Sequence, residues 1–186
     1  MNITVRDVFL SEHKALSELL VSVYSQLPGF PLPDEQPGYY EALKHVGELV
    51  EQDSIRVMVA VSDLGNVLGC IAYFDNMSVY GSGSIADHQP NACGIRFLAV
   101  DANARGLGIG RKLVNCCFEL AREANHQQII LHTTTAMIAA WRLCESLGFQ
   151  RSTDLDFLQE GLPVYGFRYH MSKDYELLLP CNNNPA

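Results

Sequence analysis

The segment ARGLGIGRKLV, residues 104–114, has the residue types of an anion-binding loop. Gly106, Gly108 and Gly110 alternate with other residues between Arg105 and Arg111, and an apolar run follows. Glycine lacks a Cβ, so its backbone N–H can approach a ligand closely. The first N–H groups of a helix have no partner within the helix and carry partial positive charge. The segment therefore predicts a phosphate-binding turn at the start of a helix.

Two familiar phosphate loops fit this spacing poorly. A Walker loop needs Gly-Lys followed by Ser or Thr, whereas Gly110 is followed by Arg111 and Lys112. A dinucleotide-binding fingerprint needs a third glycine where Arg111 stands, and no acid follows at the expected distance. A tight turn with no ligand remains an alternative for so short a motif.

The elements on both sides of the glycines give them a structural context. The run CGIRFLAV, residues 93–100, is apolar and β-branched, which is typical of a largely buried strand. After the glycines, Ile109, Leu113 and Cys117 recur at helical spacing. The order is therefore a strand, a short loop, a glycine turn and a helix.

The remaining periodicity predicts an α/β domain on a mixed sheet. We expect a strand at 2–8, helices near 16–23 and 39–51, a hairpin of strands at 55–63 and 67–75, a polar loop at 76–91, a strand at 127–135, a helix at 137–147 closed by Gly148, and strands at 149–155 and 163–173. No linker or repeat divides the chain, so residues 1–174 are expected to form one domain. Residues 175–186 are expected to be a poorly ordered tail.

Composition limits the class of protein. The chain has 186 residues, 48% hydrophobic and 18% charged, which is typical of a globular domain. A net charge of −8 disfavours nucleic acid as a partner and is compatible with cationic small molecules. No secretory signal or membrane-length apolar stretch is visible, and the cysteines lie in apolar runs without Cys-x-x-Cys pairs. We therefore expect a cytoplasmic protein with free thiols, no membrane partner and no metal.

The motifs together resemble the GNAT superfamily of acetyl-CoA-dependent N-acetyltransferases. Its signature is matched by Arg105, Gly108 and Gly110, its preceding strand by FLAV at 97–100, and its Gly-Phe helix end by WRLCESLGF. The similarity in element order covers about residues 2–172. The resemblance implies a single GNAT-like domain with a mixed, mainly antiparallel sheet flanked by helices.

The resemblance also implies a cofactor and a reaction. The pyrophosphate of coenzyme A would lie on the backbone amides of Arg105, Gly106, Leu107, Gly108, Ile109, Gly110 and Arg111, and the pantetheine arm beside Leu98, Ala99 and Val100. The expected function is direct transfer of the acetyl group of acetyl-CoA to a primary amine of a small molecule or peptide. A non-catalytic acyl-CoA-binding module and a nicotinamide-dependent oxidoreductase remain alternatives, and a homodimer is left open.

The acid and base of this reaction are less clear from the sequence. Family members often carry a Tyr four residues before the Gly of Gly-Phe, and Cys144 stands there in this chain. Its thiol could protonate the departing thiolate or could serve only in packing. The strand at 93–100 contains no acid, so Asp87 and His88 are the candidate bases, with Asp75 and His132 as further candidates. Each could equally be a solvated loop residue or a hydrogen-bonded polar group.

Overall fold

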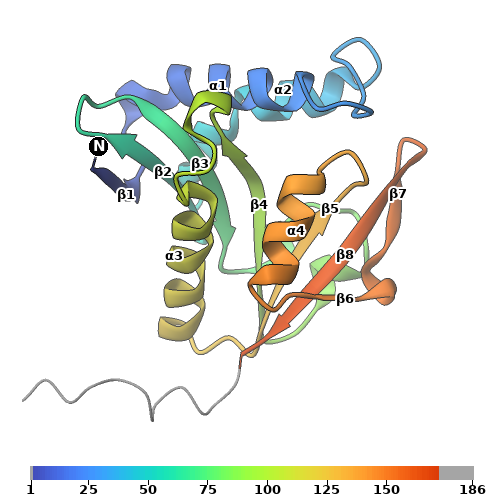
Figure 1. Cartoon of the computed structure of the whole chain (residues 1–186). Coiled ribbons are helices and arrows are strands. Elements are labelled where there is room, and N and C mark those ends of the chain that lie inside the picture. Colours follow the sequence, from blue (N-terminus) through green and yellow to red (C-terminus); the bar gives the residue numbers. More distant parts are fainter. Residues whose placement is uncertain (1, 172–186) are drawn as a thin grey trace, which may run out of the picture.

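The computed structural model describes residues 2–171 (Figure 1). Its helices are α1 (His13–Ser25), α2 (Pro37–Lys44), α3 (Ile109–Glu123) and α4 (Ile138–Ser146). Its strands are β1 (Ile3–Asp7), β2 (Ile55–Ser62), β3 (Val67–Phe74), β4 (Ala92–Val100), β5 (Gln128–Thr133), β6 (Gln150–Arg151), β7 (Phe157–Gln159) and β8 (Leu162–His170). The end of the strand expected at 163–173, the last residues of the domain expected at 1–174 and the tail expected at 175–186 lie outside the described residues.

The strands form one mixed sheet in the order β1-β2-β3-β4-β5-β8-β6, with β7 paired to β8. Only β4 and β5 run parallel, and the other pairs are antiparallel. The predicted mixed, mainly antiparallel sheet in a single α/β domain is confirmed. Side chains alternate across β2, so Val57 and Val59 enter one core while Met58 and Ala60 enter another.

Helices cover both faces of this sheet. Leu16 and Leu20 of α1 and Leu43 of α2 belong to the core that contains Val57 and Val59. Leu113 of α3 and Cys144 of α4 belong to the other core. Figure 1 shows α3 and α4 in front of the sheet, while α1 and α2 cross it at the top. The sheet is thus buried between two helical layers.

The two central strands separate along their length. Pairing of β4 with β5 runs from Ala92 and Gln128 to Ile95 and Leu131. Beyond these residues the strands diverge, and Figure 1 shows a V between them. A register shift of β3 against β4 lies at the same level, where Phe97 has a φ of +57°. A left-handed backbone is costly for a residue with a large side chain, and such outliers gather at functional sites.

Some elements differ from those expected. The second helix, expected at 39–51, ends at Lys44 and continues as a 3₁₀ turn, Val46–Glu51. The strand expected at 149–155 keeps only Gln150–Arg151 in the sheet before another 3₁₀ turn. Strand β7 was not expected, and the two residues joining it to β8, Glu160 and Gly161, both have positive φ. The other strands and helices lie where periodicity predicts them, within a few residues.

Candidate functional site

Two of the three motif glycines are required by the backbone conformation. Gly106 and Gly108 have φ of +80° and +75°, and Gly108 is the N-cap of α3. A Cβ on either glycine would meet no atom within 4 Å, so open space lies beside this turn. Gly110 differs, because a Cβ there would lie 3.0 Å from Cδ2 of Leu143 in α4. The first two glycines shape the loop, and the third permits close packing of α3 on α4.

The N-terminus of α3 has the donors that the motif predicts. Its first backbone bond to the preceding loop joins the Lys112 N–H to the Gly108 carbonyl at 3.0 Å. The amides ahead of Lys112 are those that a helix start leaves without an intrahelical acceptor. Arg105 is exposed at the turn, and Arg111 donates to Oγ of Ser146 at 3.0 Å. The turn therefore offers backbone N–H groups and positive charge to an anion.

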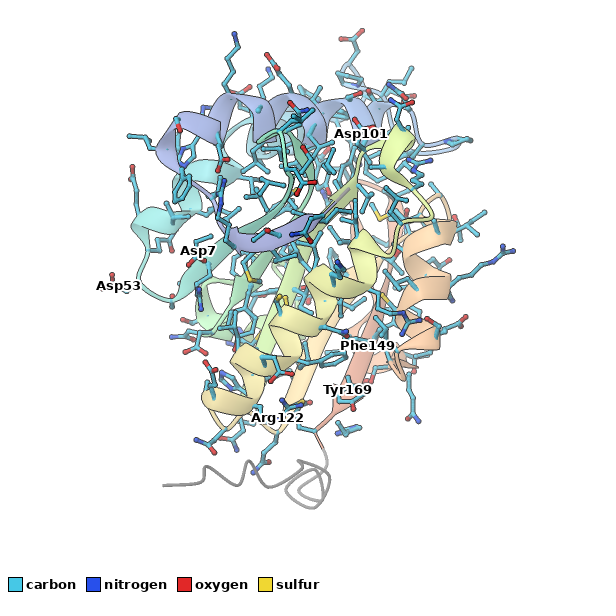
Figure 2. All side chains as sticks on the ribbon, turned by 60° about the vertical axis from the view of Figure 1, so that its left-hand side comes forward. Asp7, Asp53, Asp101, Arg122, Phe149 and Tyr169 are labelled. Carbon is cyan, nitrogen blue, oxygen red and sulfur yellow. The ribbon has the colours of Figure 1, made fainter. Side chains whose placement is uncertain are left out.

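The end of β4 leads to this turn and faces the gap between the strands. The Asp101 N–H donates to the Leu68 carbonyl of β3 at 2.8 Å, so this residue points toward β3. Because backbone groups alternate along a strand, those of Leu98 and Val100 point the other way, toward the gap. An extended ligand could pair with this edge. Figure 2 shows Asp101 between this strand and the start of α3.

A cavity of about 70 Å³ opens at the same level on the side of α1. Aromatic rings form much of its wall, and polar side chains from several separate segments of the chain reach it. The lining residues include Tyr24, Phe30, Gln36, Tyr39, Tyr80, Arg96, Phe97, His132, Thr134 and Phe157. A mostly apolar lining with a few convergent polar groups is typical of a binding site. The glycine turn and this cavity lie at the same divergence of β4 from β5.

The bulge in β4 brings two consecutive side chains into this cavity. Phe97 lies in the core on the α1 side, and the Arg96 guanidinium carbon lies 4.8 Å from the centre of its ring. One guanidinium nitrogen donates to the carbonyls of Tyr80 and Gly81 at 2.5 and 3.2 Å. Regular alternation along a strand would place Arg96 and Phe97 on opposite faces of the sheet. The left-handed backbone at Phe97 instead lets both side chains line the cavity.

Tyr80 and His132 form a hydrogen-bonded pair in the cavity. Nε2 of His132 lies 3.0 Å from the Leu155 carbonyl, and Nδ1 lies 2.9 Å from the Tyr80 hydroxyl. A carbonyl only accepts, so Nε2 carries the proton in the neutral ring and Nδ1 accepts from Tyr80. Burial lowers the pKa of His132 to about 4. The imidazole is therefore neutral at pH 7, with its free lone pair directed at Tyr80.

Two polar atoms at the cavity wall have no partner among the described residues. They are Oε1 of Gln36 and Oγ1 of Thr134, and each residue is only 3% exposed. The Gln36 amide nitrogen donates to the Gln159 carbonyl at 3.3 Å, which identifies the other amide atom as the oxygen. A buried polar atom without a partner is costly, and in native structures it often marks a site for water or a ligand.

The candidate bases in the loop before β4 lie outside this wall. Asp87 accepts from the N–H groups of Ser82 and Gly83 and from the Ser82 hydroxyl, which fixes the loop around it. His88 is exposed, and neither residue lines the cavity. Asp75 accepts from Tyr73 and pairs with His126 beyond the other end of β3. Of the sequence candidates for the base, His132 alone lines the cavity.

Cys144 lies on the inner side of α4. It is 2% exposed, packs in the core beneath α3, and does not line the cavity. Burial raises the pKa of its thiol to about 12. This environment is that of a packing residue, and the catalytic role stays a prediction. The cysteines among residues 2–171 are free thiols.

Sequence reasoning missed Arg96, Tyr80, Gln36 and Thr134. One signal was present, because Arg96 is the single charged residue in the apolar strand CGIRFLAV. A charge in a buried strand needs a reason, such as a ligand or a partner. Tyr80 and Gln36 come from loops, and nothing in their local sequence shows that these loops meet at β4.

No helix among residues 2–171 is both long and apolar enough to cross a membrane. Within the same residues, no three His, Cys, Asp or Glu side chains gather where they could hold a metal ion.

The chain is similar to proteins of one family. The acetyltransferase (GNAT) family model matches residues 15–149. N-acetylaspartate synthetase of Xenopus tropicalis is 35% identical over 86 residues, which are 46% of this chain and 28% of that protein. The chain thus matches little more than a quarter of that relative's length.

Solved structures share the fold. A GNAT-family acetyltransferase from Staphylococcus aureus Mu50 has a TM-score of 0.72 at 19% identity, covering 92% of this chain and 100% of that one. PaiA N-acetyltransferase from Thermoplasma acidophilum, solved with coenzyme A, has a TM-score of 0.70 at 14% identity, covering 91% and 100%. With the family match over most of the sequence and the glycine turn at the end of a diverging β4, the chain belongs to the GNAT acetyltransferase family.

Proposed function

We propose that this protein transfers the acetyl group of acetyl-CoA directly to a primary amine. The observation that carries the proposal is the placement of a turn suited to anions and a mostly apolar cavity with a few polar groups at the same gap between β4 and β5. The similarity to N-acetylaspartate synthetase, which by its name yields an N-acetylated amine, supports this class of acceptor. A pure binding module would not need the cavity or its hydrogen-bonded Tyr80 and His132.

The chain offers a fitting place for acetyl-CoA. The open space at Gly106 and Gly108 would receive the pyrophosphate on the amides from Arg105 to Arg111. The free edge of β4 at Leu98 and Val100 would pair with the pantetheine arm. When bound, the cofactor supplies the acetyl group as an activated thioester. An N–H of β4 directed into the gap would stabilise negative charge that develops on a carbonyl oxygen there.

Tyr80 and His132 are the groups we propose for proton transfer. An amine with a pKa near ~10 must lose a proton before it attacks. The Tyr80 oxygen can accept this proton while its own proton moves to Nδ1 of His132, the lone pair it already faces. Because burial lowers the pKa of His132 to about 4, the imidazolium then releases the proton and the neutral pair is restored. Gly94 makes room for the tyrosine, because a Cβ there would overlap the Tyr80 ring. Asp87, His88 and Cys144 lie outside the cavity wall and are not needed for this route.

The test is thiol release from acetyl-CoA across a panel of primary amines, with wild type, Tyr80→Phe and Cys144→Ala compared. Tyr80→Phe keeps the ring and removes the hydroxyl, so turnover should fall by about 10² or more. Cys144→Ala should lose stability through a small cavity and keep turnover within about threefold, since it removes only packing atoms. Loss of turnover in folded Cys144→Ala with full activity in Tyr80→Phe would reverse these roles. CoA binding without thiol release for any amine would favour the binding module.

A further inference from the structure

Arg96 places a positive charge in the cavity without an acidic partner. Its guanidinium donates to two backbone carbonyls, and no ion pair within residues 2–171 includes it. The nearby carboxylates are already engaged. Asp87 accepts from Ser82 and Gly83, and Asp156 pairs with Arg151 and accepts from the Gly166 N–H. A half-buried guanidinium without a carboxylate favours an anionic ligand.

The effect of this charge reaches across the cavity. Burial raises the pKa of Tyr24, Tyr39 and Tyr80 and lowers the pKa of His132. The positive charge of Arg96 acts on all four groups and lowers the pKa of each. All four residues line the cavity. Asp87 and Asp156 act in the opposite direction at His132, and Asp87 also at Tyr80, but both carboxylates are held by partners of their own. The Arg96 guanidinium would repel the ammonium groups of a dication such as a diamine.

The unpartnered polar atoms require a second kind of group. Oε1 of Gln36 can only accept, so its partner must carry an N–H or O–H. Oγ1 of Thr134 can accept or donate. A ligand that satisfies Arg96 and Gln36 together therefore carries an anionic oxygen and a donor. The cavity of about 70 Å³, walled by aromatic rings, admits only a small head group.

We infer that the acceptor is a small amino carboxylate, meaning a molecule that carries a primary amine and a free carboxylate, such as a free amino acid. Its carboxylate would pair with Arg96, and its N–H groups would bond Gln36. This inference rests on the proposed function and narrows its acceptor. Polyamines are disfavoured as acceptors because they carry no carboxylate. A lysine within a polypeptide is disfavoured too, because its own carboxylate has become an uncharged peptide bond.

Binding to the full chain saturated with CoA tests the inference without turnover. The probes are the twenty L-amino acids, β-alanine and γ-aminobutyrate, each compared with its carboxamide, which keeps the amine and loses the negative charge. Calorimetric titration should show at least one acid that binds about tenfold or more tightly than its carboxamide. This ratio is the gain in affinity expected from one hydrogen bond to a charged group.

Three variants locate the recognition. Arg96→Gln should weaken binding of that acid to the level of its carboxamide, and Arg96→Lys should give an intermediate affinity because the charge remains and the planar fork is lost. Arg56→Gln is the matched control, since Arg56 pairs with Asp7 on the edge of the sheet away from the cavity. Thr134→Val removes only an unpartnered hydroxyl, so the fold should tolerate it while acid binding weakens.

The outcomes separate this inference from the proposed function. Carboxamides that bind as well as the acids, acids that bind Arg96→Gln as tightly as wild type, or no binding by any acid would overturn it. In each of these cases, thiol release with amines that lack a carboxylate would still support acetyl transfer.

If Arg96→Gln does not fold, acid binding to Arg96→Lys and to Thr134→Val is compared with wild type instead. Wild-type affinity in both variants would overturn the inference.

Discussion

His132 shows how one buried ring connects the site to the stability of the fold. Desolvation lowers its pKa to about 4, and Arg96 acts in the same direction. The Leu155 carbonyl and the charges of Asp156 and Asp87 act against these effects. The folded chain therefore binds a proton at His132 less readily than the unfolded chain, whose histidine has the ordinary pKa of 6.5.

This difference predicts an acid-sensitive fold. Between pH 6.5 and about 4 the unfolded state carries a proton at His132 that the folded state lacks, so the free energy of unfolding falls as the pH falls. The full loss is about 3 kcal/mol, and about 2 kcal/mol of it should occur between pH 7 and 5. His132→Gln keeps a donor for Leu155 and cannot titrate. Urea unfolding at both pH values should show a smaller loss in the variant, and equal losses would contradict the lowered pKa.

At the scale of elements, the α3 turn was well predicted because its physics is local. Glycine at a left-handed N-cap and apolar residues at helical spacing need no knowledge of the rest of the chain. Strand β7 was missed because its turn uses Glu160 at a φ of +48°, where Asn or Asp is the usual signal. The cavity was missed because it depends on β4, β5 and two loops that meet only in three dimensions. The bulge at Phe97 has no counterpart in the alternation of the sequence.

The α3 turn allows a test that separates charge from backbone strain. Asn and Asp have similar shapes and tolerate positive φ better than other side chains. Gly108→Asn and Gly108→Asp should therefore strain the turn about equally, with Asp the better cap for the helix. Its negative charge would oppose a bound phosphate, so we expect Gly108→Asp to bind CoA several-fold more weakly than Gly108→Asn. Calorimetric titration with CoA measures this ratio, and equal affinities would mean that no phosphate lies at the turn.

At the scale of the whole molecule, the sheet consists of two parts joined at a short parallel seam. Strands β1 to β4 form one part and β5 to β8 the other, and the seam extends only from Ala92 and Gln128 to Ile95 and Leu131. Both helical layers cross this region, yet the strands beyond the seam have no direct pairing with each other. A ligand between them would connect the two parts where the chain itself does not.

Such a ligand should stabilise the whole fold, since it binds only when both parts are in place. CoA at a concentration about 100-fold above its dissociation constant would add about 2.7 kcal/mol and raise Tm by about 5–10 °C. Pantetheine, which lacks the nucleotide and its phosphates, should raise Tm much less because it cannot use the α3 turn. Hydrogen exchange should also slow at residues 98–100 and at the start of α3 with CoA, but only at residues 98–100 with pantetheine. Equal increases in Tm with both ligands would mean that the glycine turn does not bind the phosphates of CoA. Protection from hydrogen exchange only at a distant surface would mean that CoA binds outside the gap between β4 and β5.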